Sequence, residues 1–217
     1  MLNLLGKEFA IELSTRFIVS SILLFVLGSA FLISFGMLGQ PISPEVFSAF
    51  LWLLVYFGNV AGLGRTFISE REKGTHLLLK LRFRPGNVYF AKLTYNIVMS
   101  LAVALLATTL LFGLMQPSHS ESIVGLYLII SFGAIALAAG MTIVSSIVAV
   151  AGSRSSLMPI LSLPIVIPVL LLGIDATQKV LKLGITVSTW KDVGFLLGFA
   201  GTIISISYIL FPQVWED

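Results

Sequence analysis

The stretch MPILSLPIVIPVLLLG, residues 158–173, is apolar almost throughout and shows no alternation of apolar and polar residues. A membrane-spanning β-strand would show that alternation over about ten residues. In lipid a chain must pair its own backbone polar groups, so only helices or closed barrels cross a bilayer. The stretch therefore predicts a membrane-spanning helix rather than a barrel strand.

The composition of the whole chain supports the same fold class. Hydrophobic residues make up 57% of the 217 residues and charged residues only 11%, with a mean hydropathy of +1.04. A soluble domain carries about 25% charged residues, so this chain has too few charges to cover a soluble surface. The sequence holds no cysteine, which excludes a disulfide framework and thiolate metal sites. We expect an all-α integral membrane protein.

Segments long enough to span a bilayer recur along the chain. A spanning helix needs about 20 mostly apolar residues, and six segments meet that condition. They are residues 17–38, 46–63, 93–115, 123–151, 156–173 and 193–211. We expect them to form one transmembrane domain over residues 1–217. Residues 1–16 place Leu2, Leu5, Phe9 and Leu13 on one stripe, which predicts an interfacial helix; the alternative is a simple extension of the first span.

The basic residues predict how the spans are oriented. Ten of the thirteen Lys and Arg residues fall on one side of the predicted membrane, and Lys179, Lys182 and Lys191 fall on the other. Because cytoplasmic loops carry the excess of Lys and Arg, both termini are expected in the cytoplasm. The net charge of +3 is thus a topology signal and not a sign of nucleic-acid binding. Trp52 and Trp190 are expected at the outer interface and Trp215 at the inner one.

Catalytic and metal-binding patterns are missing from the sequence. It contains neither a phosphate-binding G-x-x-x-x-G-K-[ST] motif nor H-E-x-x-H. His76 and His119 lie in loops on opposite sides of the predicted membrane, so they cannot share a metal. His119 is a candidate haem ligand, but a solvated loop histidine explains it as well. Since no ionisable residue lies in the middle of a predicted span, a proton relay is not expected. We predict that the chain is not an enzyme by itself.

The longest predicted cytoplasmic segment, residues 64–92, holds seven of the thirteen basic residues. Ser69 and Glu72 fit the S-x-x-E capping box, which predicts a helix start at Ser69. The following HLLLKLRF run, residues 76–83, is leucine-rich, and its apolar face would fit a groove on a soluble partner. The alternative is a basic loop held at anionic lipid headgroups. Pro85 and Gly86 are expected to break the chain before the third span.

Three motifs together resemble a known family. The run GRTFISEREKGT, residues 64–75, is similar to the segment after the second helix of ABC-2-type transporter permeases. The proline-rich LSLPIVIPVLLLG, residues 161–173, and the end YILFPQVWED, residues 208–217, narrow the match. With six expected spans, the chain resembles the cytochrome c maturation protein B family, also called haem exporter protein B, over essentially its whole length.

That resemblance implies an ABC-2-type permease fold with a cytoplasmic coupling helix between the second and third spans. It implies a permease subunit of the bacterial inner membrane, with ATP bound by a separate ATPase subunit and haem as candidate cargo. The implied partners are that ATPase, haem-handling membrane proteins of cytochrome c maturation and a second permease copy. ATP hydrolysis would drive either haem export or release of the haem-loaded periplasmic chaperone. Two alternatives stay open: a permease for a drug, lipid or polysaccharide, and a membrane scaffold that transports nothing.

The site residues expected from the resemblance lie in the coupling segment. Residues predicted to dock on the ATPase are Glu70, Arg71, Glu72, Lys73, Gly74 and Thr75. Helix kinks are predicted at Pro159, Pro164 and Pro168, each of which removes a backbone hydrogen bond; the kink is either a hinge or a static bend.

Small and polar residues near the spans allow two interpretations each. The spacings Gly58-x-x-x-Gly62 and Gly194-x-x-x-Gly198 predict close helix approach, either between permease copies or within one. Asn59, Tyr95 and Asn96 either line a polar cavity or bond across helices or to the backbone.

Overall fold

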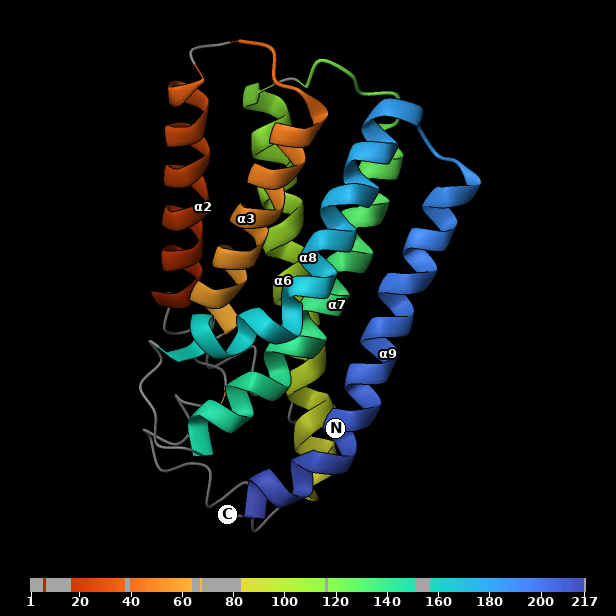
Figure 1. The fold of residues 1–217 in the computed structure, drawn as a ribbon. Coiled ribbons are helices and arrows are strands. Elements are labelled where there is room, and N and C mark those ends of the chain that lie inside the picture. Colours follow the sequence, from red (N-terminus) through yellow and green to blue (C-terminus); the bar gives the residue numbers. More distant parts are fainter. Residues whose placement is uncertain are drawn as a thin grey trace.

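The structure is a computed structural model that describes Gly6, residues 17–37, 40–63, Phe67, and residues 83–115, 117–150 and 157–216. Six long helices in these residues run alternately up and down to form one bundle (Figure 1). They are α2 (Phe17–Gly36), α3 (Pro44–Leu63), α6 (Pro85–Met115), α7 (Ile123–Val150), α8 (Met158–Leu183) and α9 (Val187–Glu216). The expected all-helical architecture is confirmed for this part of the chain.

Five of these helices, α3, α6, α7, α8 and α9, are long and apolar enough to cross a membrane. Helix α2 matches the first expected span, but its apolar stretch Ser20–Gly36 is shorter than 18 residues. Its outward face nevertheless carries large exposed apolar side chains, with Leu24 and Phe35 each more than three-quarters exposed. Such a surface suits lipid and not water. The chain is thus a multi-pass membrane protein, and the number of six spans stays a prediction.

Two expected boundaries differ from the structure. Pro85 does not break the chain: it opens α6, where a proline costs no helical hydrogen bond because N–H groups of the first turn have no acceptors within the helix. The expected outer segment 174–192 is largely helical, since α8 continues to Leu183 and α9 begins at Val187. Asp175 and Lys179 form an ion pair one turn apart on α8, so these polar residues continue the helix. Gly184 caps the end of the helix with a φ of 71°.

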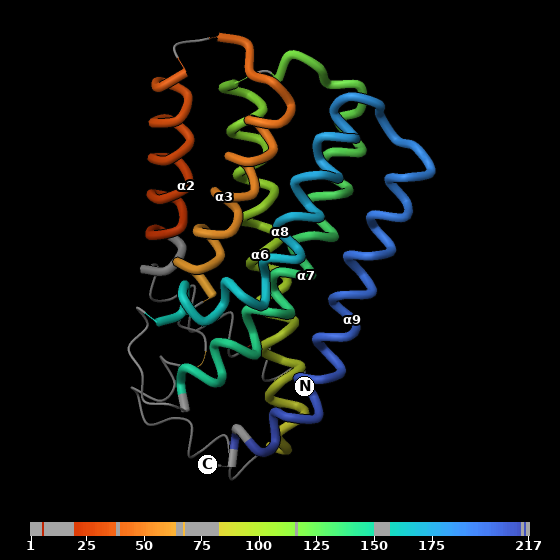
Figure 2. Tube along the Cα trace, in the orientation of Figure 1, coloured from red at the N-terminus to blue at the C-terminus, as the bar shows by residue number. Residues whose placement is uncertain are grey.

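Helix α7 lies at the centre of the bundle and packs against α6, α8, α9 and α3 (Figure 2). Its buried positions include Ala134, Ala136, Ala138 and Ala139, none with measurable exposure. Small side chains allow the neighbouring helix backbones to approach closely, as is usual in membrane bundles. Helices α2 and α9 lie on opposite sides of the bundle (Figure 1).

The connections at the upper end of the bundle in Figure 1 are joined by backbone hydrogen bonds. Ser118 donates to the carbonyl of Ile42 at 2.9 Å, and Glu121 donates to the carbonyl of Leu181 at 3.1 Å. The loop before α3, the loop before α7 and the end of α8 therefore form one connected surface. The interfacial helix expected over residues 1–16 lies outside the described residues, apart from Gly6.

Candidate functional site

The predicted docking residues, Glu70 to Thr75, lie outside the described residues. They belong to the predicted coupling segment between α3 and α6. Helix α3 ends at Leu63, before this segment, and α6 begins at Pro85. Within the segment Phe67 is described, and its side chain is only 3% exposed. The structure therefore describes the contacts of Phe67 and of the helices on either side of the segment, to which force from a docked partner would pass.

Phe67 packs into an aromatic cluster at the lower end of the bundle. Its ring centroid lies 5.7 Å from that of Phe211 and 6.2 Å from that of Trp215, both on α9. Tyr89 of α6 adds a ring 5.3 Å from Phe211. All four side chains are buried. The cluster joins the beginning of the segment after α3 to two helices that are distant in sequence.

Lys92 lies in the same cluster, although the sequence places it at the end of the predicted cytoplasmic segment 64–92. Its side chain is 1% exposed, and its Nζ lies 5.0 Å above the Phe67 ring. An ammonium group over an aromatic face is attracted by the negative face of the ring, and the attraction is stronger away from water. Sequence reasoning missed this contact because a lysine at a span end ordinarily reaches for the headgroups.

Trp52 of α3 occupies the middle of the bundle and not the outer interface, so that expectation is wrong. It is 1% exposed, and its Nε1 donates a hydrogen bond to Thr177 Oγ1 on α8 at 2.9 Å. Its ring fills a slot between two glycines: a Cβ added to Gly133 or Gly173 would lie 2.0 or 2.3 Å from ring atoms. Trp52 therefore packs α3 directly against α7 and α8.

A second contact joins α3 to α8 nearer the lower end. The Tyr56 hydroxyl donates to the carbonyl of Pro159 at 2.9 Å and lies 3.0 Å from Ser162 Oγ, which can donate to it. Tyr56 and Ser162 are both buried. The contact gives the first turn of α8 a fixed position beside α3.

A third contact joins the two helices at the upper end, where Lys182 of α8 forms an ion pair with Glu45 of α3. Both side chains are almost half exposed, so this pair adds little stability by itself. Together with the Trp52 and Tyr56 contacts it completes a series along the length of α3. The helix that leads into the predicted docking segment is thus bonded to α8 at its upper end, through Glu45, and at two positions farther along, Trp52 and Tyr56.

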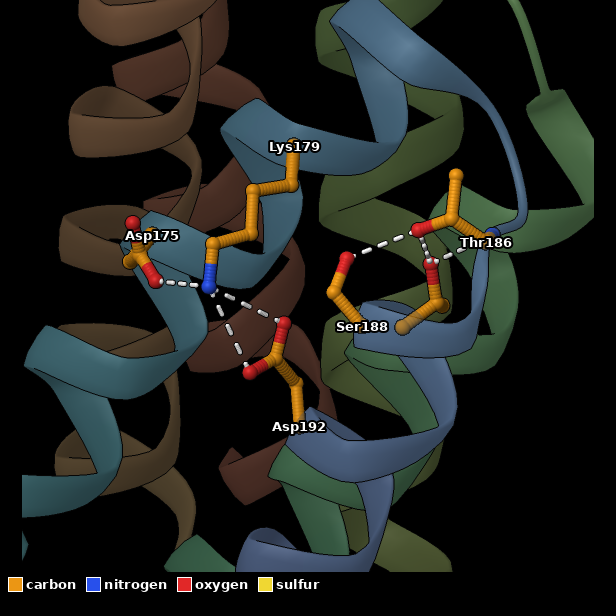
Figure 3. A network of polar contacts seen from close by, with 6 residues as sticks. Asp175, Lys179, Thr186, Ser188 and Asp192 are labelled. Carbon is orange, nitrogen blue, oxygen red and sulfur yellow. Dashed lines mark hydrogen bonds and ion pairs between the residues drawn. The ribbon is translucent and has the colours of Figure 1, made fainter.

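The upper ends of α8 and α9 share a polar network (Figure 3). Lys179 lies 2.5 Å from Asp175 Oδ2 on its own helix and 3.4 Å from Asp192 Oδ2 on α9. Asp192 is only 5% exposed. Beside it, the Thr186 backbone N–H donates to Thr189 Oγ1 at 3.0 Å and caps the start of α9. Lys179 thus holds the two helices together where the chain reverses direction.

The polar residues of α6 bond across helices. Asn96 Nδ2 donates to Thr142 Oγ1 of α7 at 2.9 Å, and Ser100 Oγ donates to the Ala134 carbonyl at 2.9 Å. Asn59 donates to the Val55 carbonyl at 2.8 Å, while its Oδ1 has no partner among the described residues. Of the two interpretations for Asn96, the bond between helices is the one the structure supports.

The three prolines predicted to kink a helix have different places in α8. Pro159 lies in the first turn, where a proline removes no intrahelical bond. Pro164 and Pro168 lie inside the helix. The first turns of α8 run across the bundle, and the remainder runs along it (Figures 1 and 2). Whether this bend acts as a hinge stays a prediction.

The two glycine spacings also have different surroundings. A Cβ on Gly58 would lie 2.7 Å from Val103 of α6, and one on Gly62 would lie 2.6 Å from Ile22 of α2. These glycines therefore serve packing within one copy. Gly194 and Gly198 have nothing within 4 Å of the corresponding position and line an apolar groove of about 520 Å³ between α8 and α9.

The helical bundle, its lipid-facing apolar surfaces and the polar contacts within it define a multi-pass membrane protein. Within the described residues, no three His, Asp or Glu side chains gather as metal ligands would. Residues 1–213 match the family described as CcmB protein, and the chain belongs to that family. No match was found among curated proteins or among solved structures.

Membership of the CcmB family explains the earlier resemblance and gives the class of function. The family is one of membrane permeases of the ABC transporter type, acting in cytochrome c biogenesis and haem export. A permease subunit of this kind is not itself an enzyme and works with an ABC partner.

Proposed function

We propose that this chain is the permease subunit of an ABC complex for cytochrome c maturation, with ATP hydrolysed on a separate ATPase subunit. The ATPase docks on Glu70, Arg71, Glu72, Lys73, Gly74 and Thr75. These charges pair with the ATPase surface and fix its register. Haem is the cargo. ATP hydrolysis drives either haem export or release of the haem-loaded periplasmic chaperone. This subunit itself holds no resident cofactor.

One observation carries the proposal most directly. Helix α3, which leads into the docking segment, is bonded to α8 through Tyr56, Trp52 and Glu45. Because these bonds run from the upper end of α3 to Tyr56, two turns before the helix ends, a displacement of α3 along its axis is transmitted to α8. Helix α8 in turn is joined to α9 by Lys179 and Asp192. A docking event on one side of the membrane thereby reaches the helix ends on the other side.

The orientation follows from the basic residues. We place the end of the bundle that holds Phe67 and Arg84 in the cytoplasm and the end that holds Lys179 and Asp192 outside, with both termini inside. The membrane is the bacterial inner membrane. The complex contains a second permease copy and the haem-handling membrane proteins of the maturation system.

A deletion and complementation experiment tests this function. The gene is deleted in its native host, or in a host that uses the same maturation system, and membrane and periplasmic fractions are stained for covalently bound haem. We expect loss of all c-type cytochromes and their recovery with the wild-type gene. Normal cytochromes in a deletion strain without a second copy would contradict the proposal and favour a permease for a drug, lipid or polysaccharide.

A biochemical measurement separates an active permease from a scaffold. The complex is purified from the native host, and ATP hydrolysis is compared with that of the isolated ATPase subunit. We expect the permease to change the rate of hydrolysis, since it transmits the ATPase's motion. An unaffected rate would identify the chain as a passive scaffold.

A further inference from the structure

The end of α9 lies directly against the beginning of the predicted docking segment. Phe211 and Trp215 are one helical turn apart and so share a face of α9. Their rings stack with an interplanar angle of 21° and a centroid distance of 5.4 Å. Phe67 contacts both rings, at 5.7 Å and 6.2 Å.

The backbone of α9 directs this face toward the bundle. Pro212 lies inside the helix, where it removes one backbone hydrogen bond and bends the helix. The last turns of α9 accordingly turn beneath the bundle toward the other helices (Figures 1 and 2). Phe211 is fully buried and Trp215 is 8% exposed, although both lie at the end of an outer helix. The bend thus places two large rings under the chain that leaves α3.

Helix α6 adds two contacts to this cluster, Tyr89 with Phe211 and Lys92 with Phe67. The Tyr89 ring lies 5.3 Å from Phe211, and Lys92 Nζ lies 5.0 Å above the Phe67 ring. Phe67 is therefore held between α6 and α9 at the point where α3 has just ended. A force on the segment that follows Phe67 acts on α6 and α9 as well as on α3.

We propose that Phe211 and Trp215 are positioning residues of the coupling apparatus: through Phe67 they fix the beginning of the docking segment to α9. The ATPase then drives α9 directly, and not only by way of α3 and α8. This inference rests on the proposed function, because it assigns a role in transmitting ATP-driven motion. Trp215 acts through its ring, so its packing and not its N–H is required; its Nε1 has no partner among the described residues.

The test uses the purified complex of permease and ATPase together with haem staining of cells. Trp215→Ala removes the ring, Trp215→Phe keeps an aromatic ring without the N–H, and Trp190→Ala is the matched control. Trp190 lies on the same helix but is 58% exposed. Four quantities are compared: permease yield and melting temperature, ATPase co-purified, ATP hydrolysed per complex, and c-type cytochrome formed per permease.

We expect Trp215→Ala to retain the ATPase while the cytochrome formed for a given rate of ATP hydrolysis falls about five- to tenfold. Trp215→Phe restores most of that ratio, and Trp190→Ala leaves it unchanged. A wild-type ratio in Trp215→Ala overturns the proposal. Trp215→Phe behaving like Trp215→Ala overturns the assignment to ring packing.

A folding defect is addressed by a second variant. If Trp215→Ala lowers the yield, Phe67→Leu replaces it, because leucine keeps an apolar side chain but removes the central ring. The same fall in the ratio is expected, and a wild-type ratio in Phe67→Leu overturns the proposal. Failure of the proposed function is recognised separately: the wild-type permease would then retain no ATPase.

Discussion

Trp52 and Thr177 form a hydrogen bond of 2.9 Å in the middle of the bundle, and this bond joins α3 to α8. The indole lies between Gly133 of α7 and Gly173 of α8, at positions where any Cβ would collide with it. Three helices therefore meet around one side chain that has almost no exposure. The relationship is the structural basis for treating α3 and α8 as one moving unit.

Gly173→Ala should destabilise the permease. The new Cβ would lie 2.3 Å from the Trp52 ring, and overpacking of this kind costs about 1–3 kcal/mol. Trp52→Leu in the same chain makes room for the methyl group, so the double variant should be more stable than the sum of the two single changes. Thermal unfolding in detergent measures both effects.

Gly198→Ala is the matched control, because nothing lies within 4 Å of its added Cβ. Alanine favours helix over glycine by about 0.8–1 kcal/mol, so this variant should be as stable as the wild type or more so. Equal behaviour of Gly173→Ala and Gly198→Ala would show that the indole does not fill the slot.

Lys179→Met should destabilise the α8–α9 end more than Asp175→Asn. Removal of Lys179 leaves Asp192, which is 5% exposed, without its cation. Loss of one partner of a fully buried pair lowers the free energy of unfolding by about 3–5 kcal/mol. Because Lys179 is partly exposed, we expect a smaller loss of about 1–2 kcal/mol.

Asp175 is 56% exposed, so Asp175→Asn should cost less than about 0.5 kcal/mol. The melting temperatures of the two variants in detergent measure the difference. Lys179→Met combined with Asp192→Asn should recover part of the loss. An equal loss in Lys179→Met and Asp175→Asn would contradict the assignment of Lys179 as the partner of Asp192.

Reversal of Glu70 and Glu72 to Lys should weaken the association of the permease with its ATPase. Like charges brought together at an interface act against binding. Glu121→Lys is the control, since Glu121 lies in the loop before α7 at the other end of the bundle. Co-purification of the ATPase and haem staining of complemented cells measure the outcome. Unchanged association and unchanged cytochromes would remove these residues from the docking site.

Single cysteines should report the orientation of the chain, because the natural sequence has none. A cysteine in place of His119, in the exposed loop before α7, should react with a membrane-impermeant maleimide in intact spheroplasts. A cysteine in place of Thr75 should react only after the membrane is opened. The reverse pattern would place both termini outside the cytoplasm.

The helix class and most helix positions could be predicted, because about 20 consecutive apolar residues have few other structures available. The ends of α8 and α9 could not, since residues 174–192, which hold Asp175, Lys179 and Asp192, fall between two predicted spans and are more polar than either. Their charges are instead paired with one another, which lets both helices continue. The pairing joins residues on two helices and leaves no local pattern.

Trp52 shows the same limit more sharply. A tryptophan near a span end is typical of the membrane interface, and nothing beside it in sequence signals burial. Its partners, Gly133, Gly173 and Thr177, come from two later helices that only the fold brings together. The docking segment is the opposite case: a short motif indicated its family, while the contacts of Phe67 with Lys92, Phe211 and Trp215 required the structure.

The most direct test of the account is ATP hydrolysis by the purified complex carrying Gly173→Ala, alone and with Trp52→Leu. If α3 transmits motion to α8 through Trp52, Gly173→Ala should lower permease-dependent hydrolysis about threefold or more while the ATPase stays bound. Trp52→Leu should not restore that rate even though it makes room for the methyl group, because it removes the indole and its bond to Thr177. Wild-type hydrolysis in an intact Gly173→Ala complex would contradict transmission through this contact.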